Sequence, residues 1–254
     1  MNNMMFTILG IMIPFFGTCL GSFFVFFLKN NMNKNFQKIM TGFAVGVMIA
    51  ASIWSLIIPS TEMAFSQGII EYLPATIGLL LGVIFLIIVN KMAEKLENKE
   101  NGKSLNMLLF SVTLHNIPEG MAVGVCFAGL LSGNSGISLL SAMILAIGIG
   151  IQNIPEGAII SMPMKVSGEK KNKAFIYGVL SGIVEPISAF LTLALTNIVV
   201  PILPYLLSFA AGAMIYVVVE ELIPEIHKEK KSCLGIISIT IGFIVMMVLD
   251  ITLG

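Results

Sequence analysis

The sequence contains no arginine and a single aspartate, Asp250, so its 14 basic residues are all Lys and 13 of its 14 acidic residues are Glu. Charged residues make up 11% of the 254 residues, against roughly 25% in an average soluble domain. The net charge of zero removes the electrostatic basis for binding nucleic acid. Because 57% of the residues are hydrophobic, too little polar surface remains for a soluble domain of this size, and the composition predicts an integral membrane protein.

Cysteine is also scarce. Cys19, Cys126 and Cys233 lie in separate apolar segments and show no CxxC spacing. This pattern excludes a disulfide framework and a thiolate metal site, and it favours cysteines that act as small buried hydrophobic residues.

Long apolar runs separated by short polar breaks predict an all-α chain of eight transmembrane helices, which form a single transmembrane domain over residues 1–254. The expected helices cover residues 4–28, 36–59, 73–92, 106–131, 137–164, 174–196, 201–224 and 233–253. Residues 60–72, after the second helix, are expected to form a loose or interfacial segment.

The lysines predict the orientation of these helices. All 14 lie in alternate loops, after the first, third, fifth and seventh expected helices, and the other loops and both ends of the chain contain none. The positive-inside rule places the lysine-containing loops in the cytoplasm and both termini outside. The expected location is therefore the cytoplasmic membrane.

Two internal repeats are visible. HNIPEG at 115–120 recurs as QNIPEG at 152–157, and GFAVGVMI at 42–49 resembles SFAAGAMI at 208–215, each of these two being followed by an Ile-Pro pair. The paired helices run in opposite directions across the membrane. Inverted repeats around a central pair of fourth and fifth helices are typical of secondary transporters.

Three glutamates, Glu119, Glu156 and Glu185, lie near the middle of the fourth, fifth and sixth expected helices, each directly beside a proline. A charge at mid-membrane costs roughly 2.5–3.5 kcal/mol. Protonated glutamates with a structural role are one explanation. Carboxylates that converge on a cation are the explanation that we favour.

Polar side chains precede two of these glutamates by one helical turn, which places them on the same helix face. They are His115 and Asn116 before Glu119, and Gln152 and Asn153 before Glu156. Imidazole nitrogen together with carboxylate and amide oxygens suits zinc and other first-row divalent ions.

These motifs, with SGIVEP (181–186) and the longer segments 42–59 and 209–225, resemble the ZIP (Zrt-, Irt-like protein) family of divalent metal transporters, in particular its bacterial GufA-type members. The resemblance implies eight helices with both ends outside and a two-metal site between the fourth and fifth helices. One implied metal position contains His115, Glu119, Gln152 and Glu156, with Met48 nearby. The second contains Asn116, Asn153 and Glu185, with Glu119 and Glu156 bridging the two positions.

The sequence departs from the family pattern at several points. Many members have His where Gln152 stands, and some have Asp where Asn153 stands. The loop between the third and fourth helices, which is His-rich in many members, contains no His here.

We therefore expect a carrier that brings zinc, or a similar ion such as Fe²⁺, Mn²⁺ or Cd²⁺, into the cytoplasm by alternating access. The metal is a substrate, and no prosthetic group is expected. An intramembrane protease would require an HExxH motif, which HNIPE does not supply, so we do not expect an enzyme. A metal-selective channel with the same ligands, a proton-coupled carrier of organic solutes and a homodimer remain open.

Overall fold

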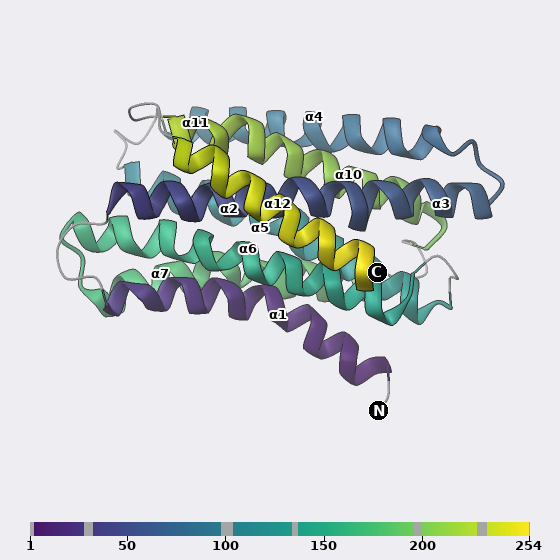
Figure 1. Cartoon of the computed structure of the whole chain (residues 1–254), viewed down its shortest axis with the longest axis horizontal. Coiled ribbons are helices and arrows are strands. Elements are labelled where there is room, and N and C mark those ends of the chain that lie inside the picture. The colour runs from purple at the N-terminus through teal and green to yellow at the C-terminus, as the bar shows by residue number, and fades with distance from the viewer. Residues whose placement is uncertain are drawn as a thin grey trace.

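The computed structural model of the chain describes residues 3–27, 33–97, 104–133, 137–195, 200–227 and 233–253. Over these ranges it is a bundle of helices without a β-strand. The helices run along one common direction, and the start of α1 and the end of α12 lie toward the same end of the bundle (Figure 1). The all-helical prediction is confirmed.

The helical elements are α1 (Asn3–Phe23), η1 (Phe24–Phe26), α2 (Lys34–Ala51), η2 (Ser52–Ile57), α3 (Ile58–Ser66), α4 (Tyr72–Glu97), α5 (Ser104–Leu131), α6 (Leu139–Val166), α7 (Lys171–Gly182), α8 (Val184–Ala194), η3 (Val200–Ile202), α10 (Leu203–Val217), η4 (Val218–Leu222), α11 (Ile223–His227) and α12 (Cys233–Leu253). Two of these elements, η2 and η4, are short π-helical segments within longer helices.

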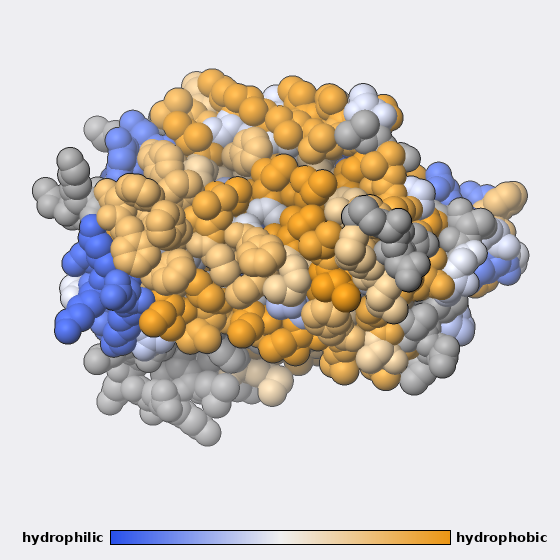
Figure 2. All heavy atoms as spheres, turned by 90° about the horizontal axis from the view of Figure 1, so that it is seen from below, coloured by the Kyte–Doolittle hydropathy of each residue, from blue (hydrophilic) through white to orange (hydrophobic). Residues whose placement is uncertain are grey.

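Seven helical segments of the described residues are long and apolar enough to cross a membrane. The remaining long helix, α5, has 28 residues and contains the apolar stretch Asn116–Leu131. Hydrophobic side chains cover the middle of the molecular surface in Figure 2, and hydrophilic side chains gather at its two ends. This pattern identifies a multi-pass membrane protein.

The second expected helix does not end at Pro59. After the π segment η2, the chain continues as α3 to Ser66, so residues 60–66 are helical and the expectation of a loose segment there is wrong. Pro59 lies in the first turn of α3, directly after the π segment η2, so the irregular turn stands where the proline N–H is missing. Buried Ser60 secures the helix by donating a hydrogen bond to the carbonyl oxygen of Pro204 at 2.7 Å.

The expected helix 174–196 is divided into two. α7 ends at Gly182 and α8 begins at Val184, and Pro186 lies in the first turn of α8. A proline there has no N–H to donate to the carbonyl of Gly182, which explains the break. The break places Glu185 in the first turn of a helix, deep in the bundle.

The second internal repeat corresponds to a repeated structure. Residues 42–49 end shortly before η2, and residues 208–215 end shortly before η4, so each copy leads into a π segment that is followed by Ile-Pro. Such irregular turns occur frequently at functional sites.

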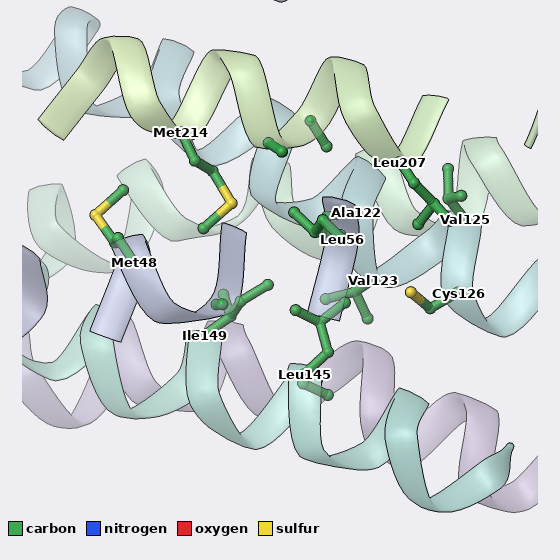
Figure 3. Packing of buried hydrophobic residues seen from close by; sticks show 14 of the residues in the cluster. Met48, Leu56, Ala122, Val123, Val125, Cys126, Leu145, Ile149, Leu207 and Met214 are labelled. Atoms are coloured by element: carbon green, nitrogen blue, oxygen red, sulfur yellow. The ribbon is translucent and has the colours of Figure 1, made fainter. Parts of the chain in front are cut away.

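The most enclosed membrane-length segments are α6 and the segment from α2 to α3, whose apolar stretches are 72% and 67% buried, whereas those of α4 and α12 are both 22% buried. α4 and α12 therefore lie at the periphery of the bundle. Between α2, α6 and α10, apolar side chains fill the interior, among them Met48, Leu145, Ile149 and Met214 (Figure 3).

Candidate metal-binding site

Adjacent helices α5 and α6 bring together the two copies of the NIPEG motif. Glu119 of the first copy accepts a hydrogen bond at Oε1 from Gln152 Nε2, which stands at the start of the second copy, at 2.9 Å. Both side chains are buried, with 1% and 0% exposure. This contact between α5 and α6 agrees with the proximity of Glu119 and Gln152 that the family resemblance implies.

A second polar pair joins α5 to α8. Asn116 Nδ2 donates to Glu185 Oε1 at 3.0 Å and to the carbonyl oxygen of Ser181 at 3.0 Å. Thr18 on α1 donates its hydroxyl to the same Glu185 oxygen at 2.9 Å. Three helices thus meet at one buried carboxylate.

Asn153 and Glu156 on α6 lie between these two pairs. Asn153 Nδ2 donates to the carbonyl oxygen of Pro14 on α1 at 3.4 Å, and its side chain neighbours both Glu119 and Glu185. Glu156 is also buried and lies one helical turn after Asn153 on the same face of α6. The carboxylates of α5, α6 and α8 therefore share one buried polar region.

The buried side-chain atoms of this polar region that lack a hydrogen-bond partner are all oxygen atoms. Among the described residues, six buried side-chain oxygens of this region have no hydrogen-bond partner: Asn116 Oδ1, Glu119 Oε2, Gln152 Oε1, Asn153 Oδ1, Glu156 Oε2 and Glu185 Oε2. The amide nitrogens of Asn116 and Gln152 donate to Glu185 Oε1 and Glu119 Oε1, and that of Asn153 donates to the Pro14 carbonyl, so the amide oxygens are the ends left without a partner. Buried polar groups normally find partners, and a set of acceptor oxygens without donors is complementary to a cation.

Within the part of the chain that the structure describes, no three His, Cys, Asp or Glu side chains form a group that could hold a metal ion by themselves. The amide oxygens of Asn116, Gln152 and Asn153 supply half of the six orphan acceptors. Any ion in this region would consequently have a mixed carboxylate and amide environment, which is an oxygen-rich donor set for a divalent metal.

Two further residues, His115 and Met48, are also predicted to belong to the site. His115 belongs to α5, but its side chain lies outside the described residues, so the prediction that it binds metal is untested. Met48 on α2 is fully buried in the apolar cluster, together with its counterpart in the repeat, Met214 (Figure 3).

The sequence analysis missed the contribution of α1. Thr18 and the carbonyl of Pro14 both reach the polar region. A signal was available, because Gly17 and Gly21 flank Thr18 with the small-xxx-small spacing that lets membrane helices approach closely. In the structure, a Cβ at either glycine would clash with the backbone of α6.

Comparison with known proteins agrees with this chemistry. The family model described as ZIP Zinc transporter matches residues 96–250. Zinc transporter ZIP11 of Xenopus tropicalis is 32% identical over 98% of this chain and 97% of that protein. Zinc transporter GufA of Myxococcus xanthus is 33% identical over 79% of this chain and 81% of its own length.

Zinc transporter ZIPB of Bordetella bronchiseptica is 31% identical over 98% of this chain and 82% of that protein. The matches thus extend over nearly the whole chain and include both copies of the NIPEG motif. The chain belongs to the ZIP family and is of its GufA type, and it is a transporter of metal ions and not an enzyme.

Proposed function

We propose that the protein carries zinc, or a similar divalent transition-metal ion, across the cytoplasmic membrane into the cytoplasm by alternating access. The observation that carries this proposal is the set of six buried acceptor oxygens without donors. In a membrane interior such a set is costly unless a positive charge compensates it. Zinc is the metal in the printed names of the relatives, and Fe²⁺, Mn²⁺ and Cd²⁺ prefer related donor sets.

The ion positions follow the two polar pairs. Around the Glu119–Gln152 pair, the first position uses these two side chains with Glu156 and His115. Around the Asn116–Glu185 pair, the second position uses those two side chains with Asn153, and Glu119 and Glu156 bridge the positions. Met48 borders the first position as a weak thioether ligand.

The packing supports a division into two moving parts. α1 packs on α6 and α7, and α5 packs on α8, so the helices that contain the polar region form one bundle. α2 packs on α12, and α10 packs on α4, forming a second bundle with the repeated π segments. Relative motion of these bundles around the bound ion would expose it to each side in turn.

The whole chain acts as a single transmembrane domain of eight crossings, with α5 completing the seven segments of membrane length. The lysine-containing loops face the cytoplasm and both termini face outward. In this orientation, the direction of transport that we propose is uptake into the cytoplasm.

The test is zinc uptake by the purified protein in liposomes that contain a zinc-sensitive dye. Glu119→Gln and Glu156→Gln are expected to abolish uptake, because each removes a bridging carboxylate. Glu185→Gln should impair uptake less, since it serves the second position alone. Saturable uptake would also distinguish the carrier from a channel.

The matched control is Glu169→Gln, which makes the same chemical change at an i, i+4 ion pair with Lys173, away from the polar region. It should transport normally. Nearly normal uptake by both Glu119→Gln and Glu156→Gln, at equal reconstitution, would overturn the proposed site.

A further inference from the structure

α1 forms one wall of the polar region, although none of its residues belongs to the ligand set proposed above. Gly17 and Gly21 let α1 approach α6 so closely that a Cβ at either position would clash with the carbonyl oxygens of Gly150 and Ile154. Thr18 lies between these two glycines and is completely buried. In Figure 1, α1 and α6 lie side by side along most of their length.

The Thr18 hydroxyl has one proton and two acceptors within reach. Its oxygen is 2.9 Å from Glu185 Oε1 and 3.4 Å from the carbonyl oxygen of Pro14. A hydrogen bond to a carboxylate is shorter and stronger than one to a neutral carbonyl. The proton therefore belongs to the bond with Glu185.

The neighbouring helix α7 has a glycine, Gly182, where it faces Thr18. A Cβ at Gly182, one turn before Glu185, would lie 2.8 Å from both Cβ and Cγ2 of Thr18. Glycine at this position lets the Thr18 side chain reach the carboxylate. The contact therefore depends on complementary residues in α1 and α7.

The donors to Glu185 are distributed unevenly. Thr18 and Asn116 both donate to Oε1, at 2.9 Å and 3.0 Å, whereas Oε2 has no partner and is buried. A purely structural contact would be expected to share donors between both oxygens. Two donors on one oxygen fix the plane of the carboxylate and leave the other oxygen free for an ion.

The backbone of α1 also orients the side chain of Asn153. Its Nδ2 donates to the Pro14 carbonyl at 3.4 Å, and its Oδ1 is left buried without a partner. α1 thus orients two of the three side chains that belong to the second ion position alone.

We infer that Thr18 is a positioning residue of the second ion position, which holds Glu185 so that Oε2 faces the ion. This inference rests on the proposed two-position site and extends it to α1. Thr18 acts through Glu185 and does not touch the ion.

The experiment measures zinc binding to the purified protein by titration calorimetry, with bound zinc counted by mass spectrometry. Thr18→Val keeps the side-chain shape and removes the hydroxyl. We expect the second binding event to weaken roughly tenfold, the effect of one hydrogen bond to a charged group, while the first event keeps its affinity. Thr18→Ser, which keeps the hydroxyl, should restore the second event.

Ser22→Ala is the matched control, because Ser22 lies one turn further along α1, is equally buried, and donates to the backbone carbonyl of Gly157 at 3.3 Å. It should leave both binding events unchanged. Melting temperatures of the metal-free proteins identify any variant that is simply misfolded. If Thr18→Val fails to fold, the comparison of Thr18→Ala with Thr18→Ser, which differ only in the hydroxyl, tests its role: the second event should be weaker in Thr18→Ala, and equal second events would overturn the inference.

The inference is overturned if Thr18→Val binds the second zinc ion as wild type does, if Ser22→Ala weakens it equally, or if Thr18→Ser does not restore it. Glu185→Gln separates this failure from failure of the two-position site. Loss of the second event in Glu185→Gln but not in Thr18→Val would overturn only the role of Thr18. A single event in wild type, unchanged in Glu185→Gln, would overturn the second position and the role of Thr18 with it.

Discussion

Glu119→Gln is expected to separate the stability of the protein from its ability to bind an ion. Glu119 Oε1 accepts a hydrogen bond from Gln152 Nε2 at 2.9 Å. A glutamine at position 119 must turn its amide oxygen toward that donor, because two amide nitrogens cannot bond to each other. Its NH₂ group then replaces Oε2, the buried oxygen without a partner, so an incoming cation would meet two hydrogens where the wild type has a carboxylate oxygen.

The energetic consequences have opposite signs. A buried charge at mid-membrane costs about 2.5–3.5 kcal/mol, so the metal-free variant should be at least as stable as the metal-free wild type. An ion that binds only the folded state adds about 2.7 kcal/mol at a hundred times its Kd. At 2–4 °C for each kcal/mol, zinc should raise the melting temperature of wild type by roughly 5–10 °C and leave that of the variant unchanged.

The assay is thermal unfolding of detergent-purified protein in a chelator and in excess zinc, with Glu169→Gln as a control that should respond like wild type. The reasoning is refuted if Glu119→Gln keeps most of the zinc-induced rise. It is also refuted if the metal-free variant melts well below metal-free wild type, since Glu119 would then have a structural role.

Three further predictions concern specificity, packing and orientation. Gln152→His should place an imidazole beside Glu119 and lower the apparent KM for zinc uptake severalfold, with an equal or lower maximal rate; an unchanged KM for every metal tested would mean that Gln152 does not face the ion. Gly21→Leu should force α1 away from Ile154 on α6 and destabilise the protein by about 1–3 kcal/mol, and an unchanged melting temperature would contradict that close packing. In a cysteine-free background, single cysteines at Lys34 and Lys171 should resist an impermeant thiol reagent added to intact cells, whereas one at Ser66 should react; the reverse labelling would invert the proposed orientation.

The family and the helical class could be predicted because each depends on local signals. Apolar runs of about 20 residues can hardly form anything but membrane helices, and the duplicated NIPEG motif is specific. The glutamates could be located from their cost in the membrane interior, since no local preference explains Glu119, Glu156 or Glu185 at those positions.

The details that the sequence analysis missed depend on contacts between distant segments. The extended helix α3 makes a hydrogen bond from Ser60 to the carbonyl of Pro204, which lies 144 residues away in the sequence. The contact of Thr18 with Glu185 involves close packing at glycines in two helices, α1 and α7, and it joins residues 167 positions apart. Hydrophobic periodicity contains no information about such partners, so these features required the structure.

The inverted repeat also extends further than the sequence reveals. Gly46 on α2 packs on the backbone of α12, and its counterpart Gly212 on α10 packs on that of α4. The fourth residue of each π segment then bonds to the outer helix: Ser55 of η2 donates to Asp250 on α12 at 2.8 Å, and Glu221 of η4 accepts from Asn90 on α4 at 3.3 Å.

Asp250 lies eight residues after Gly242 in α12, and Asn90 lies eight residues after Gly82 in α4. At these two glycines, α12 crosses α2 and α4 crosses α10. One matching glycine and one matching polar residue form too short a pattern for a sequence comparison to detect. They nevertheless make equivalent contacts in the two halves of the bundle. α2 and α10 run in opposite directions in Figure 1, so the two sets of contacts belong to copies of opposite orientation. The two halves therefore contain the same irregular backbone and an equivalent polar link to the outer helix, as expected of the inverted repeats that are typical of secondary transporters.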